Sequence, residues 1–260
     1  MSEGVTREQH EAVCVLTLDS PDTRNALSVD MRTALREHLR AAMADDTVRA
    51  VVLTGAAGHF CSGGKLQPAA DNEEPDGHRT RVNMGIMHDV IRLLANGPKP
   101  TIAAVEGYAF GAGLSLACAC DLIVAADGAK FCAAFGRVGL MADGGLIWTL
   151  AKRVGAGRAR DLLLTARIAE MAEGLRIGLC DRTAPAGGAL AAARRLAMEI
   201  SALAPLSLSA TKQALAKGAD TLEAVLATEA DVQPRLTYSA DYLEGRAAFR
   251  EKRTPRFTGA

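Results

Sequence analysis

The hydrophobic positions of this chain change their period repeatedly over its first two-thirds. Short runs rich in apolar and β-branched residues predict strands. Between these runs, apolar residues recur every three or four positions, as on the buried face of a helix. The predicted strands are Glu11–Leu18, Arg49–Thr54, Thr101–Val105, Leu122–Ala125 and Lys130–Phe131. Alternation of this kind favours a parallel sheet with crossover helices.

Two helices in the first half carry clear end signals. Ser28 is a suitable N-cap for a helix whose apolar face holds residues 31, 35, 39 and 43. A second apolar repeat, at residues 82, 86, 90 and 94, predicts a helix that Gly97 and Pro98 end. Before it, the polar stretch Gln67–Gly77 predicts a surface loop.

The last third of the sequence predicts helices almost throughout. From Gly144 onward the exception is a possible strand at Cys180–Thr183. The alanine-rich helix Gly188–Leu203, with its pair of arginines, is interpreted as a solvated face. Asp220 and Glu223 resemble a capping pair before a further helix.

Composition narrows the class of protein. The chain has 260 residues, 49% hydrophobic and 23% charged, which suits one large domain with a sizeable core. Its 30 basic and 30 acidic residues give zero net charge, so neither nucleic acid nor an anionic membrane surface is an expected partner. The N-terminus is polar and lacks the apolar segment of a signal peptide, and no apolar run is long enough to span a bilayer.

The six cysteines match no zinc-site spacing, and the five histidines form no metal set, so no metal is expected. We interpret the cysteines as reduced core residues of a cytoplasmic protein. His59 is interpreted as a structural loop residue, and Asp121 as a residue that supports the turn into the following strand.

Two glycine-bearing segments, Leu53–Leu66 and Ala104–Ala117, carry the candidate chemistry. Each follows a predicted strand, and small residues allow main-chain N–H groups to approach a bound group. The second segment also begins a helix, whose first amides lie at the positive end of the helix dipole. Neither has the spacing of a phosphate loop or of a complete dinucleotide fingerprint, so a nucleotide cofactor is not supported. Taken alone, each is also compatible with a simple tight turn.

In this order and spacing, these segments resemble those of the crotonase superfamily, the enoyl-CoA hydratase/isomerase family. Phe60–Gly64 resembles the first oxyanion loop of that family. Glu106–Ala117, followed by Cys120–Leu122, resembles the second. Arg24–Ser28 resembles its early CoA-contacting segment, and Phe249–Phe257 resembles the C-terminal segment that family members place near the CoA nucleotide.

The resemblance implies an α/β fold: a crotonase-like spiral of ββα units over residues 1–195, and an α-helical C-terminal trimerisation region over 196–260. It implies homotrimers, often paired into hexamers. The expected partner is an acyl-CoA thioester substrate, with no cofactor beyond the coenzyme A that the substrate carries.

The resemblance also assigns roles to residues. The backbone amides of Gly64 and Ala112 would stabilise the oxyanion of a thioester enolate. Lys65 stands where family members usually have Asp, which affects the side-chain hydrogen bonds of the first loop but not its amides. The substrate and its CoA would contact Arg24, Ala26, Ser62, Gly63, Gly64, Lys65, Leu66, Ser115, Phe249 and Lys252.

The acid–base residue is the least conventional feature. Hydratases of this family use two glutamates, but the corresponding positions here are Ser115 and the neighbourhood of Phe135. Asp143, before a Gly-Gly pair, resembles the carboxylate of the enoyl-CoA isomerases, including the ring-opened phenylacetyl-CoA branch, although Ala142 replaces their usual proline. Asp143 is also compatible with a helix cap, and Ser115 with a small packed residue rather than one that orients water or substrate.

A single carboxylate favours one reaction over another. Water addition is well served by two carboxylates, whereas moving a double bond from C3–C4 to C2–C3 needs one base that takes a proton from C2 and returns it to C4. The sequence therefore predicts an enoyl-CoA isomerase with Asp143 as general base and acid. The alternatives are an enoyl-CoA hydratase with an atypical site, in which Ser115 holds the water, and a non-catalytic acyl-CoA-binding protein.

Overall fold

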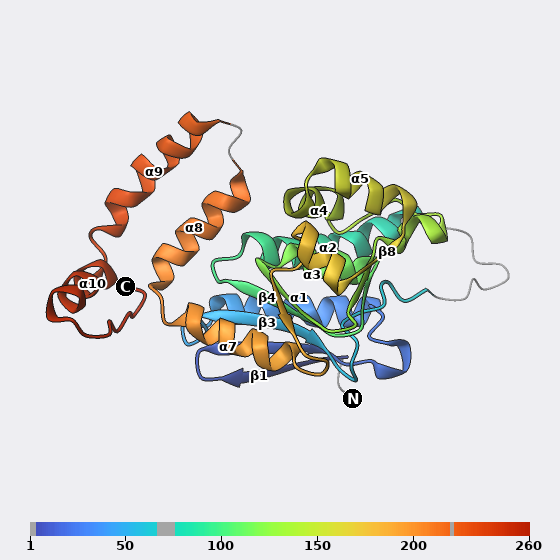
Figure 1. Ribbon diagram of the computed structural model, residues 1–260, viewed down its shortest axis with the longest axis horizontal. Helices are drawn as coiled ribbons and strands as arrows, with labels where there is room; N and C mark the ends of the chain where they lie inside the picture. Colours follow the sequence, from blue (N-terminus) through green and yellow to red (C-terminus); the bar gives the residue numbers. More distant parts are fainter. Residues whose placement is uncertain (1–3, 67–75, 219–220) are drawn as a thin grey trace.

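The computed structural model of the chain describes residues 4–66, 76–218 and 221–260 (Figure 1). Within these residues, six strands form one sheet in the order β1-β2-β3-β4-β6-β9. β1 pairs with β2 in antiparallel fashion, and the other neighbours are parallel. The strands are β1 (Val5–His10), β2 (Val13–Leu18), β3 (Ala50–Gly55), β4 (Thr101–Val105), β6 (Leu122–Ala126) and β9 (Arg182–Ala184).

Helices cover both faces of this sheet. One face packs against α1 (Val29–Ala44), α2 (Gly77–Asn96) and α3 (Ala112–Ala119), and the other against α7 (Ala189–Ser201) (Figure 1). Alternate residues of one strand therefore enter different cores: Val51 faces the α1 side and Val52 faces α7. Because both faces are buried, β3 reads as a nearly continuous apolar run.

A second, smaller sheet has three strands. Its order is β5-β7-β8, formed by β5 (Tyr108–Phe110), β7 (Lys130–Cys132) and β8 (Ile168–Glu170). The surrounding helices are α4 (Leu146–Val154), α5 (Ala156–Thr165) and α6 (Met171–Ile177), with short 3-10 turns at Pro21–Thr23 and Ala134–Val138. Repeated strand pairs and helices of this kind confirm the predicted spiral architecture.

Three C-terminal helices extend away from the sheets (Figure 1). They are α8 (Pro205–Lys217), α9 (Leu222–Leu236) and α10 (Ala240–Glu251). The predicted division between residues 195 and 196 falls inside α7, which packs on the sheet. Large apolar side chains remain exposed along these helices in the single chain: Leu215, Leu222, Val225, Leu226, Tyr242, Leu243 and Phe249.

Several sequence predictions need correction. β1, β5 and β8 were not anticipated, because β1 is largely polar and the others have three residues each. The possible strand at Cys180–Thr183 lies slightly later, as β9. The alanine-rich helix is not a solvated face: Ala189, Ala193 and Ala197 of α7 are fully buried against the sheet. Their small side chains allow the helix axis to lie close to the strands.

Other predictions concern segment ends. Residues 67–75 of the predicted loop lie outside the described residues, and Asp76 caps α2 by accepting from the amides of His78 and Arg79. Asp220 of the proposed capping pair also lies outside them. The described cap of α9 is Thr221, whose hydroxyl accepts from the Ala224 amide.

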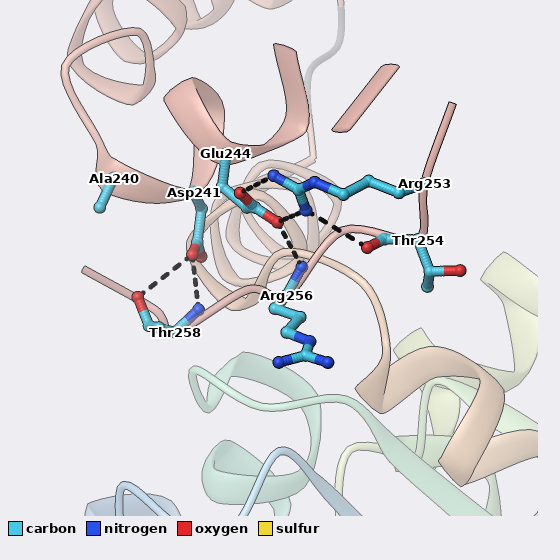
Figure 2. Close-up of a pocket in the computed structure, with 7 residues that line it drawn as sticks. All are labelled: Ala240, Asp241, Glu244, Arg253, Thr254, Arg256 and Thr258. Carbon is cyan, nitrogen blue, oxygen red and sulfur yellow. Dashed lines mark hydrogen bonds and ion pairs between the residues drawn. The ribbon is translucent and has the colours of Figure 1, made fainter. Parts of the chain in front are cut away.

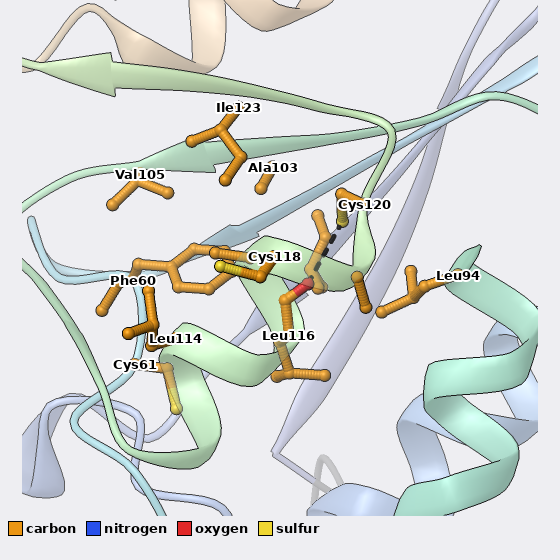
Figure 3. Close-up of a cluster of buried hydrophobic side chains, with 14 of the residues drawn as sticks. Phe60, Cys61, Leu94, Ala103, Val105, Leu114, Leu116, Cys118, Cys120 and Ile123 are labelled. Atoms are coloured by element: carbon orange, nitrogen blue, oxygen red, sulfur yellow. Dashed lines mark hydrogen bonds between the residues drawn. The ribbon is translucent and has the colours of Figure 1, made fainter. Parts of the chain in front are cut away.

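The main core lies between the large sheet and α1–α3. Figure 3 shows Phe60 with Leu114 and Cys118 of α3 beneath Ala103 and Ile123 of the sheet. All six cysteines are free and buried, as the sequence predicted. Burial raises the pKa of the Cys61, Cys118 and Cys120 thiols to about 12, so they are neutral at physiological pH and pack as small apolar groups.

Among the described residues, no group of three or more His, Cys, Asp or Glu side chains is arranged to hold a metal ion. The helices within the same ranges are also too short or too polar to cross a bilayer.

One buried lysine fastens the C-terminal helices to the core. Lys212 of α8 is 5% exposed, and its Nζ lies 2.7 Å from Asp121 Oδ2. It also donates to the main-chain oxygens of Leu94, at 2.6 Å, and Lys99, at 2.9 Å. Asp121 in turn accepts from the Thr101 amide at 2.7 Å. A cation so placed replaces its lost hydration with protein oxygens.

Replacing Lys212 should destabilise the protein strongly. The change Lys212→Met removes the charge that pairs with Asp121 and takes one donor each from Asp121, the Leu94 carbonyl and the Lys99 carbonyl. We expect the free energy of unfolding to fall by about 3 kcal/mol, measured by urea denaturation. The control is Lys217→Met, at the exposed end of the same helix. Equal unfolding midpoints for the two variants would contradict this role for Lys212.

Candidate active site

Parallel strand order brings the two glycine segments together. β3 and β4 are neighbours, so the chain leaves both at the same edge of the sheet. There the segments pair through their main chains: the Cys61 amide donates to Tyr108 O at 2.7 Å, and the Phe110 amide donates to Cys61 O at 3.0 Å. The Phe60 amide also donates to Glu106 O at 2.7 Å.

Glycine is required where the segments touch. A Cβ atom on Gly113 would lie 2.4 Å from Cys61 O, far inside van der Waals contact. A Cβ atom on Gly111 would lie 3.8 Å from the Cα atom of Gly63. Gly111 and Gly63 also have positive φ angles, 51° and 118°, which favour glycine. These positions therefore fix the two segments at main-chain contact distance.

The two predicted oxyanion donors lie at this contact. Ala112 is the first residue of α3, so its amide has no partner within the helix. Gly64 forms a parallel bridge with Leu27, in which the bonds are made by the Gly63 carbonyl and the Lys65 amide. Within the described residues, the amides of Gly64 and Ala112 donate to no protein acceptor. Both are therefore available to a bound oxygen.

Asp143 lies on the turn before α4. Its main-chain oxygen accepts from the Leu146 amide, at 3.2 Å, and from the hydroxyl of Ser115, at 2.9 Å. Its side chain caps no helix, because the N-cap of α4 is Gly145. The capping interpretation of Asp143 is therefore wrong. Ser115 is fully buried and holds the Asp143 main chain in place.

Asp143 and Ala112 line the same small cavity of about 20 Å³. Its remaining walls are Arg32, Met84, Met87, His88 and Gly144. Burial raises the pKa of the Asp143 carboxyl above its ordinary value, and the nearby Arg32 and His88 oppose part of that rise. A carboxylate with a raised pKa is a stronger base than an exposed one.

The predicted CoA-contacting residues between Arg24 and Leu66 lie on two stretches of chain that contact each other. The Ser62 amide donates to Arg24 O at 3.0 Å, and the Ser62 hydroxyl donates to Thr23 O at 2.8 Å. The Arg24 guanidinium lies 5.4 Å from the centre of the Tyr108 ring. Ala26 and Leu66 belong to the same two stretches of chain, residues 23–27 and 62–66, which the Leu27–Gly64 bridge joins.

Asn25 joins these stretches from within. It is fully buried, and its side-chain amide donates to Ala56 O at 3.0 Å and to His59 O at 2.7 Å. His59 itself stacks on Tyr108 with 5.0 Å between ring centres, which agrees with a structural loop residue. Neither side chain lines the Asp143 cavity.

Phe249 and Lys252 lie elsewhere, at the end of α10, and the single chain does not bring them to Asp143 (Figure 1). A hollow of about 830 Å³ lies on this helix (Figure 2). Its Glu244 carboxylate is already paired: it accepts from the Arg253 guanidinium at 2.6 Å and from the Arg256 amide at 2.8 Å. We interpret this network as one that holds the segment after α10 against that helix.

Sequence reasoning missed Arg32 and His88. Arg32 lies in the first turns of α1 and His88 on α2, so they are far from Asp143 along the chain. The one signal in the sequence was the place of each residue in its helix. Arg32 follows the core residue Met31, and His88 follows the core residue Met87. Such proximity to the buried face does not specify what the side chain meets in the fold.

One known protein family matches almost the whole chain. The family model described as enoyl-CoA hydratase/isomerase matches residues 8–260. The chain belongs to the enoyl-CoA hydratase/isomerase family. It is therefore an acyl-CoA-processing enzyme of the crotonase fold.

Individual relatives span the whole chain. It is 35% identical to the 1,2-epoxyphenylacetyl-CoA isomerase of Escherichia coli K12, covering 100% of both chains. It is 38% identical to a probable enoyl-CoA hydratase of Rhodobacter capsulatus, covering 97% of this chain and 96% of the relative. The crystal structure of an enoyl-CoA hydratase from Polaromonas sp. JS666 has a TM-score of 0.92 at 37% identity, covering 97% and 99%.

The burial of Asp143 predicts a pH-dependent cost in stability. Its folded-state pKa is raised above the ordinary 3.8, so ionisation disfavours the folded state once the pH exceeds the unfolded-state pKa. Asp143→Asn should therefore be more stable than the unmodified protein at pH 7, on the order of 1 kcal/mol. The difference should disappear as the pH falls through the ordinary aspartate range, as followed by urea unfolding.

The exposed Asp127 provides the matched control, because Asp127→Asn removes a carboxylate that is already solvated. A stability gain for Asp143→Asn that is independent of pH would show that burial of the charge is not its cause.

Proposed function

We propose that this protein is an enoyl-CoA isomerase that moves a double bond of an acyl-CoA thioester by way of an enolate. The observation that carries the proposal is the shared cavity of Asp143 and Ala112: the buried Oδ1 atom of Asp143 has no hydrogen-bond partner among the described residues, and the Ala112 amide has none either. A full-length relative at 35% identity is named an isomerase, which is compatible with this proposal, and another at 38% identity is named a probable enoyl-CoA hydratase, which keeps hydration as the alternative.

The chemistry follows from charge. Asp143 takes a proton from C2 of a 3-enoyl thioester, and the electron pair of that C–H bond forms the C1–C2 double bond of the enolate. The negative charge gathers on the thioester oxygen, which the amides of Gly64 and Ala112 stabilise. Asp143 then returns the proton to C4 while the double bond forms between C2 and C3. Asp143 is again an unprotonated carboxylate at the end of the cycle.

Two features make Asp143 suited to shuttle a proton. Burial raises the pKa of its carboxyl, which makes the carboxylate a stronger base toward the C2 proton. The Ser115 hydroxyl, by holding the Asp143 main chain, keeps the carboxylate on one side of the substrate. Return of the proton on the same face needs only this one group.

The alternatives differ in what they require. A hydratase with its water on Ser115 would need a hydroxyl that is fully buried and already donates to main-chain oxygen. A non-catalytic binder would hold the thioester without exchanging its C2 protons for deuterium.

We also propose that the chain assembles as a homotrimer, or as a pair of trimers. The exposed apolar side chains of α8–α10 would be covered by a neighbouring subunit. The same arrangement would allow Phe249 and Lys252, which lie far from the cavity of their own chain, to contact the CoA nucleotide bound by a neighbour.

Loss of the carboxylate should abolish isomerisation. With 3-hexenoyl-CoA as substrate, Asp143→Asn should lower kcat about 1000-fold, followed by the absorbance of the conjugated thioester. Asp127→Asn, on an exposed turn, should retain the full rate. Equal rates in Asp143→Asn and the unmodified enzyme would remove Asp143 from the mechanism, and hydration of crotonyl-CoA that survives the change would favour the hydratase.

Loss of one oxyanion amide can be tested without changing a side chain's charge. Ala112→Pro replaces the N–H of the first residue of α3 with a ring carbon, so it removes the donor and occupies the space beside it, at a helix position that proline tolerates. We expect kcat/KM to fall about 100- to 1000-fold with little change in stability. Ala156→Pro makes the same change at the start of α5, also after a glycine, and should be neutral. Full activity in Ala112→Pro would exclude this donor.

A further inference from the structure

The segment that follows α10, residues 254–259, is bonded to the first turn of that helix (Figure 2). Asp241 is 3% exposed, and its carboxylate accepts from the Thr258 amide at 2.6 Å and from the Gly259 amide at 2.9 Å. Hydrogen bonds to a carboxylate are stronger than those between neutral groups, so two of them make a firm attachment. The segment is therefore held to the beginning of α10.

Phe257 joins this segment to the core of the protein. Its ring lies against α10, because a Cβ atom on Gly245 would be 3.6 Å from Phe257 Cε1. Its main-chain oxygen accepts from Arg49 Nη2 at 2.6 Å. Arg49 directly precedes β3, so this bond crosses from the large sheet to the C-terminal helices. One residue of the segment thus contacts both α10 and the core.

The bond from Arg49 crosses a loosely packed junction. Lys212 fastens α8 to the core, but in the described part of the chain no hydrogen bond or ion pair other than that of Arg49 joins α9, α10 or the segment to the sheets or to α1–α7. A hollow of about 530 Å³ lies at this junction, with Pro98 and Pro100 on the core side and Pro205 of α8 on the other. The place of α10 relative to the core therefore depends strongly on the segment.

α10 carries Phe249 and Lys252, the two residues proposed above to contact the CoA nucleotide bound by a neighbouring subunit. The Phe249 side chain is 88% exposed, and Lys252 is the C-cap of the helix. If α10 could swing freely, these side chains would be in the binding position for a fraction of the time, and the apparent affinity would fall by that fraction. A segment that fixes α10 before the substrate arrives removes this cost.

We infer that Arg49 and Asp241 are positioning residues: through residues 254–259, which we call the strap, they hold α10 where it contacts the CoA nucleotide bound by the neighbouring subunit. This inference rests on the proposed function, which supplies the trimer and the nucleotide contact. It adds that the core of one subunit sets the affinity of the next subunit for CoA. The strap does not touch the Asp143 cavity, so it acts on binding of the nucleotide and not on the proton transfer.

Binding of two thioesters to the full chain, measured by calorimetry, tests this role. Butyryl-CoA and S-butyryl-pantetheine share the acyl group and the pantetheine arm, but only butyryl-CoA carries the nucleotide. Arg49→Met removes the bond to Phe257 O, so it should weaken binding of butyryl-CoA about tenfold and leave that of S-butyryl-pantetheine unchanged. Arg182→Met removes an exposed arginine of β9 that donates to the main chain of its neighbour Asp181, and it should leave both affinities unchanged.

The other end of the strap provides a second variant. Asp241→Asn keeps the size of the side chain but replaces one acceptor oxygen with an NH₂ group, so one of the two bonded amides loses its acceptor. We expect the same selective loss of affinity for butyryl-CoA. This variant decides the question if Arg49→Met fails to fold, and the exposed Asp127→Asn is its matched control.

An unchanged affinity of Arg49→Met for butyryl-CoA would overturn the inference, and so would an equal loss for both thioesters, which indicates general damage to the fold. Lys252→Met separates the possible failures. If Lys252→Met weakens binding of butyryl-CoA and Arg49→Met does not, the nucleotide contact stands and the role of the strap is wrong. If neither weakens it, the contact itself is wrong and the strap has no such role. No arm measures isomerisation, so the proposed reaction is judged separately.

Discussion

The candidate site depends on the direct contact of two main-chain segments at the edge of a parallel sheet. With Gly113 against the Cys61 carbonyl, no side chain separates the loops, and the amides of Gly64 and Ala112 remain open. The donors are thus parts of the backbone, held by strand pairing and by a helix start. Their positions are set by the fold itself and do not rely on side-chain rotamers, which makes them preorganised for developing charge.

The acid–base group is placed by a different principle. Burial raises the pKa of the Asp143 carboxyl. The Asp143 main chain is held by Ser115 and by the start of α4. A carboxylate in such a position costs stability when ionised, and the protein retains it beside an arginine that lowers the cost only in part. Strain of this kind at a buried charge is typical of functional sites, where reactivity and stability oppose each other.

The pattern of apolar residues explains which strands and helices could be predicted from the sequence. β3, β4 and β6 were evident because burial on both faces demands continuous apolar runs, and α1 and α2 because their stripes and end signals agree. β1 could not be predicted, because a largely polar edge strand has no continuous apolar run. Gly64, Ala112 and Asp143 came from family resemblance. Arg32 and Lys212 were missed, because the position of a charged residue within an amphipathic helix does not reveal which groups its side chain meets in the fold.

Lys212 joins α8 to the helix that lines the reaction cavity. Its Nζ binds the carbonyl of Leu94 near the end of α2, while Met84, Met87 and His88 of the same helix form one wall of the reaction cavity. α2 is thus joined to α8 near its C-terminal end and forms the pocket wall along its middle turns. A shift of α8 that keeps the Lys212 hydrogen bonds would carry α2 with it, which would couple the pocket wall to the position of the C-terminal helices.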